Sequence, residues 1–304
     1  MELAHNKNHR SGFVNIIGHP NVGKSTLLNA LVGERMSIIT HKPQTTRHRI
    51  IGILNSDDYQ VVFSDTPGVI KKTIYKMQER MNAFVHSTTE DADIMMLVID
   101  LTEPFDADSP TLQILKKVKC PVFLILNKRD LITDEKLIET ITTWKDIADF
   151  KEIIPISALK KINTELLLKK LIEYLPEGPV YYPKDQFTDR PERFFVSEII
   201  REKILLLYHQ EIPYSVEVIV DTFKEDPEPE KNLVRIHATI YVSRKSQKGI
   251  IIGDKGTAIK KLGMESRKSI ETFLEKRVFL ELFVKIKEDW RDDEGSLKMF
   301  GYDD

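Results

Sequence analysis

Runs of apolar residues recur along the first half of the chain, separated by longer segments of mixed or amphipathic character. The runs are FVNIIG, YQVVFSD, IMMLVID, PVFLILN and EIIPIS. Continuous apolar runs of this length are typical of parallel strands buried on both faces, with helices between them. The pattern therefore predicts a doubly wound α/β sheet. One more strand, RHRIIGILNS, precedes YQVVFSD across the turn-prone NSDD and predicts an antiparallel edge hairpin.

The pattern changes after the helical segment TELLLKKLIEYL, which stops at Pro176. The stretch PEGPVYYPKDQFTDRP carries four prolines and no periodicity, which predicts a semi-rigid, extended connector. Beyond it we expect a helix, two strands, two helices around GDKG and a final strand, VFLELFVKIK. The second half is thus predicted to be an α+β domain of order α-β-β-α-α-β.

These changes predict five segments: an N-terminal tail (1–12), an α/β domain (13–175), a linker (176–192), an α+β domain (193–288) and an acidic C-terminal tail (289–304). A chain of 304 residues with 41% hydrophobic residues has room for two hydrophobic cores. We expect the acidic tail to be solvated, although Trp290 within it is expected to pack, as is Trp144.

Net charge, cysteine content and the lengths of the apolar runs limit the classes of protein to which this chain can belong. A formal net charge of -2 gives no bulk sign of nucleic-acid binding, so any such site must be local. The single cysteine, Cys120, excludes a disulfide framework and fits a reducing compartment. The N-terminus lacks the apolar core of a signal peptide and no apolar run is long enough to span a membrane, which predicts a cytoplasmic protein.

The segment GHPNVGKS fits the phosphate-binding pattern G-x-x-x-x-G-K-[ST] and lies between a predicted strand and a predicted helix. Its backbone NH groups can turn toward phosphates at the helix N-terminus, Lys24 supplies a positive charge, and the Ser25 hydroxyl can ligate Mg²⁺. The predicted nucleotide-binding residues here are Gly18, Asn21, Val22, Gly23, Lys24, Ser25 and Thr26.

A second motif, DTPG, follows the strand YQVVFS. Asp65 emerges at the carboxyl edge of the sheet, where ligands bind in open α/β folds, and suits an outer-shell magnesium partner. Gly68 can bring its backbone NH close to the γ-phosphate. The next residue is Val69, where many GTPases have a glutamine that aligns the attacking water.

The base is selected by NKRD, directly after the strand PVFLIL. The Asp130 carboxylate can accept two hydrogen bonds from guanine, whereas adenine offers no donors there, so the motif predicts GTP rather than ATP. Asn127 and Lys128 belong to the same motif. The SAL segment after the next strand, Ser157, Ala158 and Leu159, could offer a backbone NH to guanine O6.

In the second half, IIGDKG carries G-x-x-G between two predicted helices. This loop allows RNA backbone to approach closely, and the surrounding fold predicts a KH domain of the bacterial topology, which binds single-stranded RNA. Residues 244–268 hold eight basic and two acidic residues, enough for a local phosphate-binding stripe. The predicted RNA-binding residues are Lys248, Ile251, Ile252, Gly253, Asp254, Lys255, Gly256, Ile259 and Lys260.

These motifs, in the forms GHPNVGKSTLLN, PQTTRHRIIG, DTPG, NKRD and ISAL, resemble the translation-factor-related GTPases and in particular the Era family. The segments SQKGIIIGDKGTAIKKLG and FLELFVKIKEDWRDDE resemble the KH half of that family. The likeness covers nearly the whole chain after the first dozen residues. It implies a P-loop GTPase domain followed by a type II KH domain, in a ribosome-assembly protein.

The resemblance also implies roles for particular residues. It makes KPQTTR the first switch loop, with either Thr46 or Thr45 as the magnesium-binding threonine, Thr46 being preferred. Potassium-activated relatives carry the same P-loop asparagine, so K⁺ at Asn21 could replace an arginine finger, with water aligned by backbone groups near Thr46 and Gly68. The implied partners are the 3′ end of 16S rRNA and the 30S subunit. The protein is expected to be a monomer, able to associate peripherally with the inner face of the membrane.

Two functions from different classes remain open at this point. One is a GTPase switch with slow hydrolysis, stimulated by K⁺ and RNA, whose catalytic residues are Lys24, Thr46, Gly68 and Asn21. The other is a non-catalytic GTP-sensing RNA-binding module, which Val69 favours. A single P-loop and no reactive cysteine near the C-terminus argue against a tandem GTPase or a tRNA-modifying relative.

Overall fold

The computed structural model describes residues 9–302 except 105, 107 and 108, so most of the predicted N-terminal tail lies outside the described residues. The chain forms two compact units. Unit 1 comprises Met1–Ser37, Thr46–Ile74 and Gln78–Asp189, and unit 2 comprises Ile38–Thr45, Tyr75–Met77 and Arg190–Asp304. Two short segments from the first half of the sequence therefore belong to unit 2. The predicted segments, each continuous in sequence, do not include this exchange.

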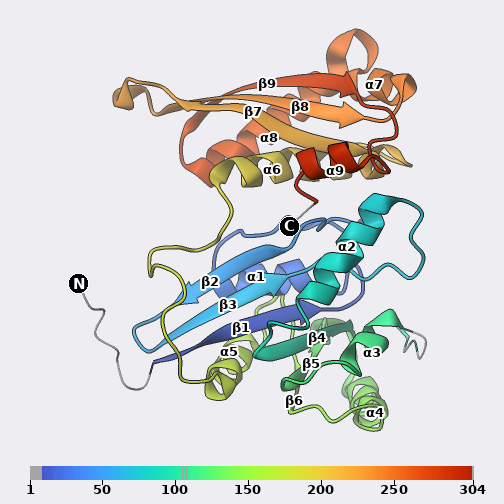
Figure 1. Ribbon diagram of the computed structural model, residues 1–304, viewed down its shortest axis with the longest axis vertical. Helices are drawn as coiled ribbons and strands as arrows, with labels where there is room; N and C mark the ends of the chain where they lie inside the picture. Colours follow the sequence, from blue (N-terminus) through green and yellow to red (C-terminus); the bar gives the residue numbers. More distant parts are fainter. Residues whose placement is uncertain (1–8, 105, 107–108, 303–304) are drawn as a thin grey trace. The chain divides into compact units, whose positions relative to one another are not determined.

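Unit 1 is built on a mixed six-stranded sheet of order β2-β3-β1-β4-β5-β6 (Figure 1). The strands are β1 (Arg10–Ile17), β2 (Ile50–Asn55), β3 (Tyr59–Asp65), β4 (Ile94–Asp100), β5 (Val122–Asn127) and β6 (Glu152–Pro155). Only β2 runs antiparallel to its neighbour. The predicted edge hairpin and doubly wound sheet are confirmed. Because β1, β3, β4 and β5 reach their carboxyl ends at one edge, the motifs that follow them gather there.

Helices cover both faces of this sheet. They are α1 (Lys24–Val32), α2 (Lys76–Ser87), α3 (Pro110–Leu115), α4 (Asp134–Lys145) and α5 (Thr164–Tyr174). Side chains of α2, α3 and α4 form one core with β4 and β5, in which Trp144 is 7% exposed. The prediction that Trp144 packs is confirmed. None of the helices within the described residues has the length and apolar character needed to cross a membrane.

The proline-rich segment after α5 is bound along unit 1. The Ile53 amide donates to the Phe187 carbonyl at 2.8 Å, and the Gln60 amide nitrogen donates to the Tyr182 carbonyl at 2.8 Å. The ring of Tyr181 lies 5.0 Å from that of Phe13. The extended segment up to Asp189 therefore belongs to unit 1.

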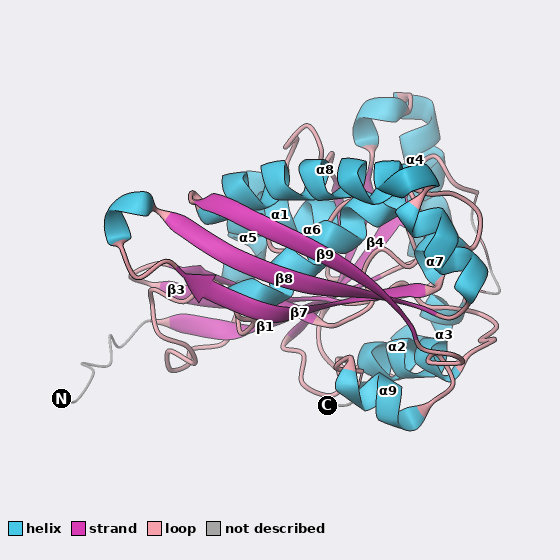
Figure 2. Cartoon of the chain, turned by 90° about the horizontal axis from the view of Figure 1, so that it is seen from above, coloured by secondary structure: helices cyan, strands magenta, loops and turns pink. Residues whose placement is uncertain are grey.

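Unit 2 contains a three-stranded sheet of order β7-β8-β9, with β7 antiparallel and β9 parallel to β8 (Figure 2). Its elements are α6 (Glu192–Leu207), β7 (Val216–Glu225), β8 (Leu233–Val242), α7 (Lys245–Ile252), α8 (Thr257–Leu274) and β9 (Arg277–Ile286). One hydrophobic core joins α6, α7 and α8 to the sheet. The predicted α-β-β-α-α-β order is confirmed.

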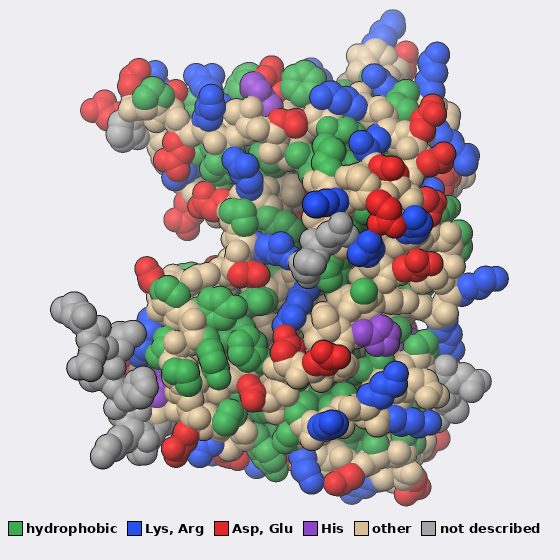
Figure 3. Space-filling model, in the orientation of Figure 1, with side chains coloured by type: hydrophobic (Ala, Val, Ile, Leu, Met, Phe, Trp, Pro, Cys, Tyr) green, Lys and Arg blue, Asp and Glu red, His purple; other side chains and the backbone are tan. Residues whose placement is uncertain are grey.

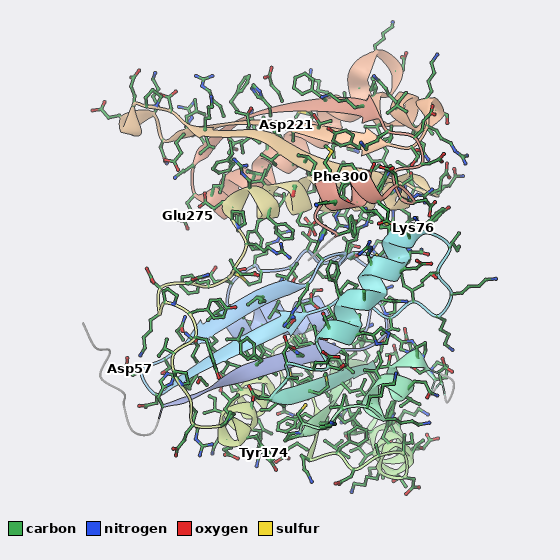
Figure 4. All side chains as sticks on the ribbon, viewed as in Figure 1. Asp57, Lys76, Tyr174, Asp221, Glu275 and Phe300 are labelled. Atoms are coloured by element: carbon green, nitrogen blue, oxygen red, sulfur yellow. The ribbon has the colours of Figure 1, made fainter. Side chains whose placement is uncertain are left out.

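Residues 290–302 pack within unit 2. Trp290 and Tyr302 are only 0% and 1% exposed. Phe300, labelled in Figure 4, follows α9 (Glu294–Met299). The centre of its ring lies 5.3 Å from that of Trp290 and 5.2 Å from that of Tyr241. The prediction that Trp290 packs is confirmed. The expectation of a solvated tail is wrong, because the aromatic residues within this acidic segment form a cluster that charge composition does not reveal.

The same C-terminal segment holds the start of α2. The Lys76 amide donates to Asp292 Oδ1 at 3.0 Å, and the Met77 amide donates to the Arg291 carbonyl at 2.9 Å. The Arg291 guanidinium lies 3.7 Å from the centre of the Tyr75 ring. The first amide groups of a helix have no partner within it, so these contacts supply partners that the helix itself lacks.

Candidate functional site

The P-loop connects β1 to α1. Gly23 has φ 98° at the start of α1, and a Cβ there would clash with the Asn127 side-chain amide, so glycine is required. The Lys24 ammonium donates to the carbonyls of Gly18 at 3.0 Å and His19 at 2.8 Å, and the residue is 6% exposed. Burial lowers the pKa of Lys24 to about 8, partly offset by the Asp65 carboxylate. A bound phosphate would supply the negative charge that favours the protonated lysine.

Three predicted magnesium-binding side chains meet beside Lys24. Ser25 Oγ donates to Asp65 Oδ2 at 2.6 Å and lies 2.9 Å from Thr46 Oγ1. Asp65 is completely buried, and burial raises its pKa against the opposing effect of Lys24. Its other oxygen, Oδ1, has no hydrogen-bond partner among the described residues. Two hydroxyls and a carboxylate with a free oxygen are the kind of ligand set that Mg²⁺ accepts.

Thr45 and Thr46 have different surroundings. Thr45 Oγ1 donates to the Lys42 carbonyl at 2.6 Å and lies 2.6 Å from Thr40 Oγ1, so it is engaged within its own loop. Thr46 Oγ1 instead reaches Ser25. This geometry favours Thr46 over Thr45 as the magnesium-binding threonine.

The base-recognition motif is tied to the P-loop. Asn127 donates to the Val22 carbonyl at 2.7 Å and accepts from the Ala158 amide at 3.0 Å, which joins NKRD, the P-loop and SAL through one buried side chain. Lys128 has a left-handed backbone, φ 63°, and its ammonium pairs with Asp100. Asp130 is exposed, in a 3₁₀ turn, where its carboxylate is available to a ligand.

The remaining predicted nucleotide residues lie around this centre. Ser157 is buried, Leu159 is 77% exposed, and Thr26 lies in the first turn of α1. Gly68 lies against Pro20, since a Cβ on it would be 2.6 Å from the Pro20 nitrogen. The structure therefore brings the P-loop, DTPG, NKRD and SAL together at one edge of the sheet.

Val69 and Asn21 are the two residues whose surroundings are relevant to the activation of an attacking water. Val69 is half-buried against the core formed by α2, α3 and β4 and carries no polar group. Asn21 is exposed at the P-loop with a left-handed backbone, φ 65°, a conformation that asparagine tolerates better than most residues.

The sequence reasoning did not single out two polar residues that shape the site. Ser37 Oγ donates to Asp65 Oδ2 at 3.1 Å, and the Ser37 amide donates to Asn29 Oδ1 at 2.9 Å. Asp100 pairs with Lys128. Asp100 ends an apolar strand as Asp65 does, and that signal could have identified it. Ser37 lies in an irregular segment and gives no such signal.

The G-x-x-G loop of unit 2 joins α7 to α8. Gly253 has φ 73°, and a Cβ on it would be 2.6 Å from Ala258 Cβ, so the loop approaches α8 closely. Asp254 and Lys255 are exposed at its tip, and Lys255 also has a left-handed backbone, φ 47°. Gly256, with φ 79°, is the N-cap residue directly before α8.

The apolar residues beside this loop differ in exposure. Ile251 is 0% exposed within the core of unit 2, and its carbonyl accepts from the Tyr208 hydroxyl at 2.9 Å. The prediction that the Ile251 side chain contacts RNA bases is wrong, because the helix turns it inward. Ile252 and Ile259 are half-buried, whereas Ile250, which was not predicted, is 49% exposed.

The predicted basic residues lie at the surface near the loop. Lys260 is exposed on α8 and Lys248 is half-buried on α7. Figure 3 shows Lys and Arg side chains over the region of unit 2 that carries α7. An exposed loop with basic residues on both flanking helices can hold a phosphodiester backbone.

Two family descriptions match the chain: "50S ribosome-binding GTPase" over residues 13–128 and "KH domain" over residues 211–291. Two solved structures are similar over nearly their full length. One is Era from Aquifex aeolicus bound to GDP.AlF4-, with 38% identity, 96% of this chain and 99% of that chain covered, and a TM-score of 0.91. The other is Era in complex with MgGDPNP and nucleotides 1506-1542 of 16S ribosomal RNA, with 37% identity, coverage of 97% and 99%, and a TM-score of 0.89.

Curated relatives agree. The GTPase Era of Syntrophus aciditrophicus (strain SB) is 50% identical, with 97% of this chain and 96% of the relative covered. The GTPase Era of Ruminiclostridium cellulolyticum is 45% identical, with 97% and 98% covered. The predicted P-loop GTPase fold with a KH domain is confirmed, and the chain belongs to the Era family of GTPases.

Proposed function

We propose that this protein is a GTP hydrolase that works as a switch, binds the 3′ end of 16S rRNA through its KH domain and acts in assembly of the 30S subunit. One observation is the main support for GTP hydrolysis: Ser25, Thr46 and Asp65 converge beside the buried Lys24. The same site includes Asp130, the residue assigned to base recognition. The ribosomal RNA in one Era complex and the guanine nucleotides in both support the ligands proposed.

In this proposal Lys24 attracts the β- and γ-phosphates, and the backbone NH groups from Asn21 to Thr26 surround them. Ser25, Thr46 and Asp65 would hold Mg²⁺, which when bound neutralises charge that develops on the transferring phosphoryl group. Gly68 is placed to offer a backbone NH to the γ-phosphate. Catalysis then depends on position and charge, for which a glutamine at residue 69 is not indispensable.

We assign to Asn21 a second role, as a ligand for K⁺. Its side-chain oxygen would coordinate the ion together with backbone carbonyls of the first switch, so that the ion supplies the charge of an arginine finger. The exposed position and left-handed backbone of Asn21 in the P-loop support this role.

The Asn21→Asp variant is expected to hydrolyse GTP at least about tenfold more slowly in K⁺ buffer and to show a changed K⁺ dependence, since an arginine finger contributes roughly 10³- to 10⁵-fold elsewhere. Initial rates over a K⁺ series, with Na⁺ holding ionic strength constant, measure both effects. Asn163→Asp is a matched control, because Asn163 also has a left-handed backbone, φ 58°, but lies at the start of α5. An unchanged rate and K⁺ dependence would exclude the role of Asn21.

In unit 2, the RNA is proposed to follow the G-x-x-G loop. Lys255→Glu should weaken binding of an RNA that copies the 3′ end of 16S rRNA by about tenfold or more and lower the slope of log affinity against log salt by roughly 1. Fluorescence anisotropy over a salt series measures both. Lys285→Glu, an equal charge change at an exposed lysine of β9, should have a smaller effect. Equal losses in the two variants would indicate general charge attraction instead of a site at the loop.

Multiple-turnover GTP hydrolysis in matched K⁺ and Na⁺ buffers, with and without that RNA, tests the proposal as a whole. A low rate that rises with K⁺ and with RNA supports a GTPase whose hydrolysis is timed by RNA binding. If GTP binds but phosphate is released under no condition, the protein is a non-catalytic GTP-sensing RNA-binding module. Sedimentation with vesicles separately tests the peripheral membrane association proposed from the resemblance.

A further inference from the structure

A buried ion pair on α6 has contacts beyond its own helix. Arg201 is 0% exposed and Glu198 is 4% exposed, and Arg201 Nε donates to Glu198 Oε1 at 2.7 Å. Burial opposes the positive charge, but the Glu198 carboxylate outweighs burial and keeps the pKa of Arg201 above its ordinary value. An arginine that stays charged in the core of unit 2 retains several directional N–H donors.

Those donors reach the loop that precedes Thr46. Arg201 Nη1 donates to the Gln44 carbonyl at 3.4 Å, and Nη2 donates to the Thr45 carbonyl. Both carbonyls belong to the segment Ile38–Thr45, which is part of unit 2. Arginine is suited to this task because its planar guanidinium can serve neighbouring acceptors and Glu198 at the same time.

The loop conformation that Arg201 contacts is an unfavourable one without such support. Gln44 has φ 57°, in the left-handed region that side chains larger than glycine seldom adopt. Lys42, two residues earlier, donates to the Tyr208 carbonyl just after α6 at 2.6 Å. Residues in such backbone conformations persist where surrounding contacts hold them, and they concentrate at functional sites.

The next residue in the chain is Thr46, whose hydroxyl lies 2.9 Å from Ser25 Oγ. Because Thr45 and Thr46 share a peptide bond, holding the Thr45 carbonyl restricts where the Thr46 hydroxyl can be. We propose that Arg201 is a positioning residue for GTP hydrolysis: held by Glu198, it fixes the Gln44–Thr45 backbone so that Thr46 can ligate Mg²⁺. This inference rests on the proposed role of Thr46.

A purely structural role for the pair is the competing explanation. Buried ion pairs can often be replaced by apolar residues of similar volume without loss of stability, whereas removing one partner leaves an uncompensated charge. The informative variant is therefore the double substitution Glu198→Leu with Arg201→Met, which removes both charges of the pair and fills the space. The buried Glu217 carboxylate also interacts with Arg201, but it keeps the hydrogen bond that the Tyr302 hydroxyl donates to it at 2.8 Å. Arg193→Met is the control, because Arg193 is an exposed arginine on the same helix.

The full-length double variant is expected to melt within a few degrees of the wild type and to bind GDP unchanged, because the P-loop and base contacts remain. Its kcat should fall about tenfold or more, and the Mg²⁺ concentration for half-maximal hydrolysis should rise by a similar factor, with little change in KM. Arg201→Lys should recover part of kcat, since one ammonium can serve one carbonyl. Arg193→Met should match the wild type in all five measurements.

A Thr46→Ala arm separates failure of this inference from failure of the magnesium assignment. If Thr46→Ala loses activity while the folded double variant keeps both kcat and Mg²⁺ dependence, Arg201 has no positioning role and the assignment of Thr46 stands. If Thr46→Ala itself keeps full activity, the role of Thr46 is wrong and the inference fails with it. If the double variant unfolds, the single variant Arg201→Lys is used instead, with GDP affinity as the control for folding. A lower kcat together with a higher Mg²⁺ requirement then supports the positioning role, and wild-type values of both contradict it.

Discussion

Replacing Lys24 with methionine should lower kcat for GTP hydrolysis by roughly 10²- to 10³-fold, the usual consequence of removing one preorganised charge from a transition state that gathers negative charge. Lys24 is buried and held by two P-loop carbonyls, so its ammonium has a fixed position. Methionine fills the same space without charge. Single-turnover hydrolysis at saturating GTP measures the effect on chemistry apart from binding.

The melting temperature shows whether the loss of kcat in Lys24→Met is caused by unfolding. The pKa of Lys24 in the folded protein, about 8, is below the reference value of 10.5, so the unfolded chain binds more protons between these values. Below pH 8, Lys24 therefore lowers the free energy of unfolding of the nucleotide-free protein. This destabilising contribution decreases as the pH rises from about 8 toward 10.5. Lys24→Met should melt no lower than the wild type at pH 7. Lys117→Met, at an exposed lysine, should leave kcat unchanged, and a full rate in Lys24→Met would contradict the assigned role.

Asp130→Asn should weaken GTP binding by about 10³-fold and favour xanthosine triphosphate over GTP. Two hydrogen bonds to a charged acceptor are worth roughly 1.5–3 kcal/mol each, and an asparagine amide presents a donor where guanine also has one. Xanthine has a carbonyl at that place, which can accept from the amide. Binding of both nucleotides by isothermal titration calorimetry measures the exchange of preference.

The control is Asp146→Asn, which removes one carboxylate at the exposed end of α4. It should not change the affinity for GTP or for xanthosine triphosphate. The assignment of Asp130 is contradicted if GTP affinity is retained, or if both nucleotides are weakened equally. Equal weakening would mean that the substitution disturbs Asn127 and its contacts with Val22 and Ala158 rather than base recognition.

Sequence reasoning works best here where the determining residues are adjacent in the chain. The P-loop, DTPG, NKRD and SAL each follow an apolar strand, and parallel strands must end at a common edge, so their convergence could be predicted. The α-β-β-α-α-β order of unit 2 could also be predicted, because it depends on local periodicity.

Other features depend on contacts between residues far apart in sequence. Ile250, Ile251 and Ile252 are identical in type, and only the orientation of α7 decides that Ile251 is buried and Ile250 is 49% exposed. The choice between Thr45 and Thr46 depends on which hydroxyl the loop directs inward. The segment Ile38–Thr45 belongs to unit 2, in which Arg201 contacts the Thr45 carbonyl, and the sequence of the loop does not reveal this.

The two tryptophans divide between the units. Trp144 is 7% exposed in unit 1, and Trp290, in the C-terminal segment, is 0% exposed in unit 2. Each therefore reports on one unit by its own fluorescence, and replacing either with phenylalanine leaves a single optical probe. With Trp144→Phe, emission follows the hydrophobic cluster built by Trp290 and Phe300, and with Trp290→Phe it follows the nucleotide-binding half. Denaturation curves of the two variants would show whether the halves lose their structure together or in succession, and which half a bound guanine nucleotide protects.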